Sequence, residues 1–305
     1  MKNNRSLSAY LIIILLLSSI FISAMLVFKQ YGAFLAQGYM LLPAIAALLT
    51  RIFFDPRKFS DANLRLGRWS DYLKFWITSL GISALTFLVY TLFGAGEWDL
   101  SGQAFLDRMA AQFLALGQDM NTATPSGMTP QMMLWLYFWG GLTIFNIVPG
   151  VITGFGEEFG WRGLLFPRLY AIKPWVAFII GGLIWYVWHL PLMLVSPQPS
   201  SLQTQMLLMP VLALGSICTF TYLAYVYVKS GSVFVTAVAH ITMNNAQASL
   251  SYIFEVQNML LANIGLVMVM AIVVIILLRS GQFQIFEQYF GTHKGTRDVQ
   301  EPIRT

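Results

Sequence analysis

Residues 257–278, QNMLLANIGLVMVMAIVVIILL, contain no charged side chain over 22 positions. About 20 apolar residues in a helix cross the hydrocarbon core of a bilayer, which is roughly 30 Å thick. Seven other segments have a comparable length and apolar character: about 8–28, 33–53, 73–93, 131–156, 174–196, 205–228 and 232–254. The sequence therefore predicts an all-α, polytopic membrane protein of about eight transmembrane helices.

The composition of the whole chain excludes most other classes of protein. Only 10% of the 305 residues are charged, whereas about 25% are charged in a soluble domain. Hydrophobic residues make up 57%, and the mean hydropathy is +0.66. A single cysteine, Cys218, excludes an intramolecular disulfide and a cysteine-based zinc site. A cytosolic enzyme, a coiled coil and a disordered chain are all inconsistent with these values.

The distribution of positive charge predicts the orientation in the membrane. With eight spans, 16 of the 18 Lys and Arg residues fall in segments that share one side, and the exceptions are Lys29 and Arg108. Such segments normally face the cytoplasm. We therefore expect both termini to be cytoplasmic. The net charge of +5 is explained by this arrangement around the lipid bilayer, and no nucleic-acid partner is expected.

Two connections between spans carry further predictions. In the outer connection, about 94–130, Phe105, Met109, Phe113 and Leu116 recur at helical spacing, which predicts a short helix on the outer membrane surface. The inner segment 54–74 places Arg and Lys beside aromatic residues, a pattern typical of contact with anionic lipids.

Ionisable residues at membrane depth are confined to the fourth, fifth and seventh spans. They are Glu157, Glu158, Arg162, His189 and His240, with Asn244 one turn beyond the last. Such groups are costly in hydrocarbon and are functional candidates by default. Two histidines on separate spans, near a pair of glutamates, predict one shared site.

Helical geometry distinguishes the two glutamates. Glu158 and Arg162 are four residues apart and can form an ion pair, whereas Glu157 points about 100° away, toward the side of Trp161. This favours Glu158 as a structural residue and Glu157 as a base. The alternative, in which both glutamates pair with Arg162, stays open, and so does the choice of base between them.

Two chemistries fit these side chains. In the first, Glu157 and His189 deprotonate a water that attacks a peptide carbonyl, while His240 and Asn244 donate hydrogen bonds to the oxyanion. In the second, Glu157, His189 and His240 bind Zn²⁺, which activates the water. Because the H-E-x-x-H pattern is absent and Asn is an uncommon zinc ligand, the residues slightly favour the metal-free chemistry.

The order and spacing of these residues resemble the CPBP family of intramembrane proteases, which includes type II CAAX prenyl endopeptidases and bacteriocin-processing proteins. The family pattern is E-E-x-x-x-R, then F-x-x-x-H, then H-x-x-x-N or -B. Here it is matched by Glu157-Glu158-x-x-x-Arg162, by Trp185 four residues before His189, and by His240-x-x-x-Asn244. The match covers about 133–255, and Trp185 departs from the usual Phe.

The resemblance implies an eight-helix fold with a conical cavity that opens to the cytoplasm. It also implies that Glu157 and His189 activate water, that His240 and Asn244 complete the site, and that Glu158, Arg162, Trp161 and Trp185 support it. The family has been described both as zinc-dependent and as glutamate-type. The expected division of the chain is 1–130 for three spans and the outer loop, 131–256 for the CAAX-protease-like catalytic core, and 257–305 for the last span and tail.

The predicted function is that of a bacterial intramembrane endopeptidase acting on a membrane-associated or lipidated peptide or protein. Two other classes were weighed against it. A non-catalytic scaffold or bacteriocin-immunity-type protein has little reason to bury Glu157, His189, His240 and Asn244 together. A proton-coupled transporter would be expected to show an internal repeat or ionisable groups in the other five spans, and the sequence has neither.

Overall fold

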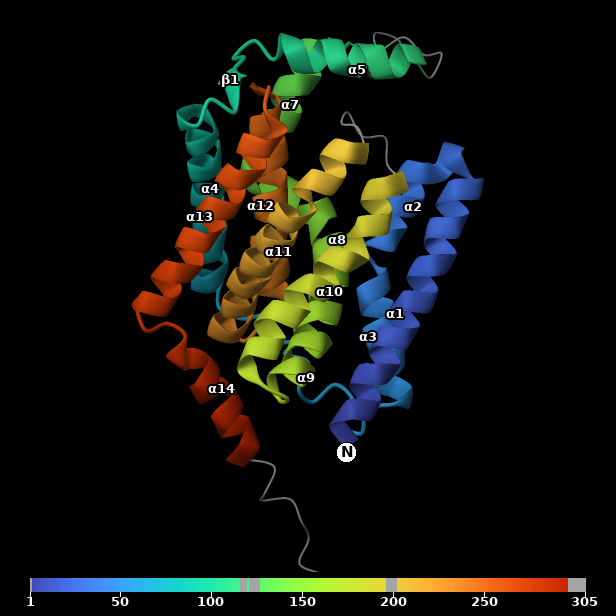
Figure 1. Ribbon diagram of the computed structural model, residues 1–305, viewed down its shortest axis with the longest axis vertical. Coiled ribbons are helices and arrows are strands. Elements are labelled where there is room, and N and C mark those ends of the chain that lie inside the picture. The colour runs from blue at the N-terminus through green and yellow to red at the C-terminus, as the bar shows by residue number, and fades with distance from the viewer. Residues whose placement is uncertain (1, 116–119, 121–126, 196–201, 296–305) are drawn as a thin grey trace, which may run out of the picture.

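The protein is described by a computed structural model that covers residues 2–115, 120, 127–195 and 202–295 (Figure 1). Within these residues the chain is almost entirely helical. Six helices are long and apolar enough to span a membrane, and they have the following cores: Arg5–Val27, Phe34–Phe53, Trp69–Leu92, Pro174–Leu192, Met206–Ser230 and Met259–Arg279. The prediction of an all-α polytopic membrane protein is confirmed.

These six spans belong to α1 (Lys2–Val27), the pair α2 (Gly32–Tyr39) and α3 (Leu42–Phe53), α4 (Trp69–Leu92), α10 (Pro174–Val195), α11 (Leu202–Ser230) and α13 (Met259–Arg279). The two other predicted spans correspond to α7 (Pro130–Leu142) with α8 (Ile147–Gly160), and to α12 (Val233–Ser251). The first is broken by a 3-10 turn at Ile144–Asn146, and the second is polar. These two irregular crossings, together with α10, carry the ionisable residues.

The helix α12 lies in the centre of the bundle, where it packs against α4, α7, α8 and α11 (Figure 1). Residues 235–243 of α12 are all buried. Because α4 packs against α12, α3 against α8 and α13 against α11, segments outside 131–256 surround the predicted catalytic core. The three-part division of the chain stays a prediction.

Short elements cap the two ends of the bundle (Figure 1). At one end, β1 (Gly96–Trp98) pairs antiparallel with β2 (Phe254–Val256), and α5 (Gln103–Ala115) lies across the bundle. At the other end lie the start of α1, α9 (Phe166–Tyr170) and α14 (Gln284–Gly295). The first and last described residues, Lys2 and Gly295, are therefore at the end of the bundle opposite α5.

The predicted surface helix is α5, although Leu116 lies outside the described residues. Its residues Phe105, Leu106 and Met109 pack with Leu134 of α7 and with Tyr252. The apolar face of α5 is thus covered by protein, and its contact with the membrane surface stays a prediction.

Small residues allow α8 to approach its neighbours closely. A Cβ on Gly156 would meet the carbonyl oxygen of Met40 at 2.8 Å, and one on Gly160 would meet backbone atoms of Pro43 at 2.6 Å. This explains the glycines around the two glutamates as a packing feature. After Gly160 the helix continues as one π-helical turn, Trp161–Leu165, a geometry that is frequent at functional sites.

A buried ionic cluster joins the 54–68 connection to α9. Arg168 pairs with Asp55 and with Asp61, at 2.8 Å for the latter, and Arg51 pairs with Asp61 at 2.8 Å. Burial acts to raise the pKa of Asp61, but the two guanidinium groups outweigh it and hold that pKa at about 2. Of the basic residues in segment 54–74, Arg57 joins this cluster through Asp55 and Asp61, whereas Arg68 is exposed, and the contact of this segment with anionic lipids stays a prediction.

Removing one partner of this cluster should destabilise the fold. The Arg168 side chain is 1% exposed, and breaking a buried ion pair costs about 3–5 kcal/mol. We expect Arg168→Ala to lower the midpoint of thermal unfolding in detergent by several degrees. Arg68→Ala is the matched control, because Arg68 is 77% exposed where it pairs with Asp71, and such pairs contribute about 1 kcal/mol or less. Equal midpoints for the two variants would contradict the role assigned to the cluster.

Candidate active site

Glu158 is held by two other side chains in the interior of the bundle. Its Oε1 accepts a hydrogen bond from Arg162 Nη1 at 2.8 Å and another from His240 Nδ1 at 2.8 Å. The side chains of Glu158 and Arg162 are completely buried, and that of His240 is 3% exposed. Glu158 therefore ties α8 to α12 and fixes the His240 ring with its Nε2 away from the ion pair.

Arg162 is enclosed by aromatic rings on its other side. Its guanidinium carbon lies 4.2 Å from the ring centroid of Phe220 and 5.4 Å from that of Trp185, and Nη2 donates to the Phe220 carbonyl at 3.3 Å. These contacts, together with the Glu158 carboxylate, compensate for burying the cation. The ion pair predicted between Glu158 and Arg162 is present.

Glu157 faces a different set of partners. Its Oε2 accepts a hydrogen bond from the indole N–H of Trp185 at 2.9 Å and lies 3.7 Å from His189 Nε2. Among the described residues, no Lys or Arg nitrogen lies within 4.0 Å of this carboxylate. The alternative in which both glutamates pair with Arg162 is therefore not what the structure contains.

The position of His189 follows from its other ring nitrogen. Nδ1 lies 2.9 Å from the Trp185 carbonyl, which can only accept, so Nδ1 carries the proton. In the neutral ring, Nε2 is then an acceptor that faces the Glu157 carboxylate. Two acceptors in this position require a proton donor between them, such as a water molecule.

Aromatic side chains pack against the ring of His189. Trp188 contacts its ring edge-to-face at 4.6 Å between centroids. Trp188 in turn donates from its indole nitrogen to Ser18 Oγ at 3.0 Å, stacks on Tyr39 at 4.7 Å, and accepts a hydrogen bond from Tyr39 at its carbonyl. The first two spans thus help to fix the part of α10 that carries His189.

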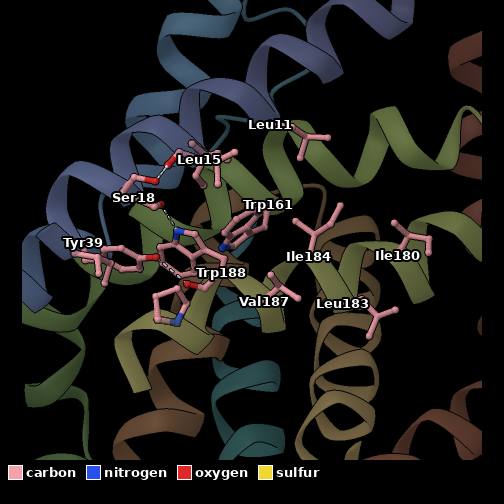
Figure 2. A pocket seen from close by; sticks show the side chains of 14 residues that line it. Leu11, Leu15, Ser18, Tyr39, Trp161, Ile180, Leu183, Ile184, Val187 and Trp188 are labelled. Atoms are coloured by element: carbon pink, nitrogen blue, oxygen red, sulfur yellow. Dashed lines mark hydrogen bonds between the residues drawn. The ribbon is translucent and has the colours of Figure 1, made fainter. Parts of the chain in front are cut away.

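Two tryptophans named from the sequence occupy different places. Trp185 meets His189 and His240 edge-to-face, at 5.2 and 5.7 Å between centroids, so it contacts both imidazole rings at once. Trp161 is fully buried against Tyr10 and Trp188 and lines an apolar pocket between α1 and α10 (Figure 2). It supports the site through Trp188 rather than facing Glu157.

An open cavity of about 300 Å³ brings His189, His240 and Asn244 to one space between α10, α11, α12 and α13. Asn244 is exposed there, one turn beyond His240. The cavity is also lined by Tyr186, Gln247 and Asn263. The sequence analysis did not identify Gln247 and Asn263 as site residues because it considered ionisable side chains and these two are uncharged. Their polar amides within otherwise apolar spans could have indicated them.

Two of the polar lining residues lie toward one end of the bundle. Gln247 is four residues before the end of α12 at Ser251, and Asn263 is four residues after the start of α13 at Met259, next to β2. The cytoplasm-facing cavity and the cytoplasmic termini both stay predictions.

The residues proposed as zinc ligands do not fit a metal site well. No group of three His, Cys, Asp or Glu side chains within the described residues is arranged to hold a metal ion. His240 Nδ1 is engaged by Glu158, and Glu157 Oε2 already accepts the Trp185 N–H.

A comparison with protein families agrees with this constellation. Residues 139–246 match the family described as Rce1-like, type II CAAX prenyl endopeptidase. This match, over about a third of the chain, agrees with the resemblance to the CPBP family of intramembrane proteases. The matched segment contains both glutamates, Arg162, both membrane histidines and Asn244. None of the curated proteins matches the chain.

The different partners of the two glutamates predict different effects on stability. Glu158→Gln would leave the buried Arg162 without its carboxylate, and such losses cost about 3–5 kcal/mol. Glu157→Gln keeps an amide oxygen that can accept the Trp185 N–H. We expect thermal unfolding in detergent to shift downward by several degrees for Glu158→Gln and to change little for Glu157→Gln. The reverse order would assign the structural role to Glu157.

Proposed function

We propose that this protein is a CPBP-type intramembrane endopeptidase in which Glu157 and His189 activate a water molecule. The observation that carries the proposal is the 3.7 Å separation of Glu157 Oε2 from His189 Nε2, with each group oriented by Trp185. A water molecule between these two acceptors can donate one hydrogen bond to each of them. The carboxylate then acts as the general base as the oxygen attacks a peptide carbonyl.

His240 and Asn244 are proposed to stabilise the negative charge that develops on the carbonyl oxygen. With Nδ1–H bonded to Glu158, an imidazolium ring presents an Nε2–H to the cavity, and the exposed Asn244 amide supplies a second donor. Donors fixed in advance in a site of low polarity are effective at such stabilisation. Glu158 and Arg162 would hold His240 in position without contacting the substrate.

Proton return completes the reaction. As the tetrahedral intermediate collapses, the C–N bond breaks and the proton taken up by Glu157 passes to the departing amine. The products are a new carboxylate and a new protonated amine: the water supplies one oxygen of the carboxylate, and its two protons end on the amine. His189 keeps the proton on Nδ1 through its bond to the Trp185 carbonyl.

The substrate is proposed to be a membrane-associated or lipidated peptide or protein segment, because the cavity lies among transmembrane helices. We place the protein in a bacterial cell membrane with both termini in the cytoplasm, which the distribution of 16 and 2 basic residues favours. Its partners in this proposal are the peptide substrate and the lipid bilayer, with no nucleic acid.

Cleavage of a quenched fluorescent lipidated peptide by purified protein tests the assignment. We expect Glu157→Gln to lower the rate by about 10²–10⁴-fold, the usual contribution of a general base. Glu97→Gln makes the same chemical change at an exposed position outside the site and should leave the rate unchanged. Full activity in Glu157→Gln would show that Glu157 is not the base.

A zinc chelator separates the two chemistries in the same assay. Because the proposed mechanism uses only side chains and water, the wild-type rate should not change after chelation. Loss of activity that is restored by Zn²⁺ would instead identify a metalloprotease. Measuring the metal content of the purified protein before chelation provides the control.

A further inference from the structure

Tyr10 is a fully buried residue of α1 whose hydroxyl has no hydrogen-bond partner among the described residues. The helix that carries it packs against α3, α9 and α10. A hydroxyl that is removed from water without a partner is costly, and nearly all buried polar groups in proteins are hydrogen-bonded. The position of this hydroxyl in the apolar first span therefore requires a physical explanation.

The neighbours of the Tyr10 hydroxyl are charged groups of the candidate site. Glu157 and Arg162 are close enough to interact with it electrostatically. Tyr222 of α11 provides a contrast, because its hydroxyl is also buried without a partner but lies beside the neutral hydroxyl of Ser79. Tyr10 thus brings a group that can both donate and accept a hydrogen bond to the charged centre of the site.

A second unpaired donor lies next to Tyr10. The ring of Trp161 meets that of Tyr10 edge-to-face at 6.0 Å between centroids. Trp161 is fully buried, and its indole Nε1 has no hydrogen-bond partner within the described part of the chain. It begins the π-helical turn, one helical turn after Glu157. Two buried donors, one from α1 and one from this turn, are therefore adjacent to each other near a carboxylate.

The carboxylate of Glu157 can accept further hydrogen bonds. Its two oxygens offer about four acceptor positions, and the Trp185 N–H occupies one of them. The Glu157 side chain is only 6% exposed. Additional donors to this carboxylate must therefore come from the protein or from buried water.

A buried water molecule typically makes about three hydrogen bonds to groups that would otherwise be unpaired. We propose that Tyr10 is a positioning residue for Glu157, through a bound water that accepts hydrogen bonds from the Tyr10 hydroxyl and the Trp161 N–H and donates one to the Glu157 carboxylate. This water is distinct from the one between Glu157 and His189. The bridge would hold the carboxylate in the orientation in which Oε2 faces His189, and would make the first span part of the site. The inference rests on the proposed function only for its effect on the rate.

Thermal unfolding in detergent tests the bridge without requiring catalysis. Tyr10→Phe removes the hydroxyl and keeps the ring that contacts Trp161. Removing an unpaired buried hydroxyl is neutral or stabilising, whereas removing one that is linked to a charged group is destabilising. We expect Tyr10→Phe to lower the unfolding midpoint by several degrees in the wild type, and by clearly less in the Glu157→Gln background. A midpoint that stays the same or rises in the wild type would overturn the inference.

Tyr222→Phe is the matched control for this coupling. It makes the same chemical change at another buried hydroxyl, which lies beside Ser79 rather than Glu157. Its effect on the midpoint should be the same in the wild type and in Glu157→Gln. If Tyr10→Phe also gave equal shifts in the two backgrounds, its hydroxyl would act independently of Glu157 and the bridge would be excluded.

The peptide cleavage assay tests the positioning role. We expect Tyr10→Phe to lower kcat by about tenfold or more, the effect of losing a hydrogen bond to a charged group, with KM unchanged because Tyr10 does not contact the substrate. Tyr222→Phe should leave both constants unchanged. An unchanged kcat, or a change confined to KM, would contradict the positioning role.

The two measurements separate this inference from the proposed function. Coupling between Tyr10 and Glu157 in unfolding, in a protein that cleaves no peptide, would contradict the proposed function and support the bridge. Peptide cleavage that depends on Glu157, without coupling in unfolding and with full kcat in Tyr10→Phe, would contradict the bridge alone.

Discussion

The rest of the site depends on the burial of Glu158 between Arg162 and His240. A carboxylate, a guanidinium and an imidazole meet with 2.8 Å contacts in side chains that are 0–3% exposed. In hydrocarbon none of these groups is tolerated alone, so the helices that carry them must stay in contact. The ion pair thus fixes α8 against α12 and, through Phe220, against α11. It engages Glu158 and the Nδ1 of His240, and leaves Glu157 and His189 facing each other on another side of α8.

That division explains why adjacent glutamates can have different roles. A helix turns by about 100° per residue, so Glu157 points at α10 while Glu158 points at α12. The π-helical turn at Trp161–Leu165 follows directly and carries Arg162 toward Glu158 and Phe220. Glycines at 156 and 160 permit α8 to contact the backbone of the α2–α3 pair, which brings Tyr39 behind Trp188 and so behind His189. The site residues of α8, α10 and α12 are thereby held in one geometry.

The spans and one ion pair of the site could be predicted from the sequence, each for a different physical reason. Apolar segments near 20 residues identify the spans because the bilayer sets their length. The fourth predicted span is broken into two short helices, and the seventh contains several polar residues, so neither reaches the length and hydropathy of the six apolar spans. The polar residues that lower the hydropathy of the seventh span include His240 and Asn244 of the candidate site. The i,i+4 geometry predicted the ion pair of Glu158 with Arg162. It could not predict the contacts between helices, such as Trp185 with Glu157 or His240 with Glu158, because these depend on how distant segments pack.

The basic residues near one end of the bundle have two uses that the sequence alone does not separate. Sixteen of the 18 Lys and Arg residues fall in segments that share one side, a pattern that favours the cytoplasm for that side. Two of them, Arg51 and Arg168, are nevertheless buried and pair with Asp61, and Arg168 also pairs with Asp55. Because these guanidinium groups join the ends of helices inside the protein, a count of basic residues per segment overstates the charge that is available to lipid headgroups.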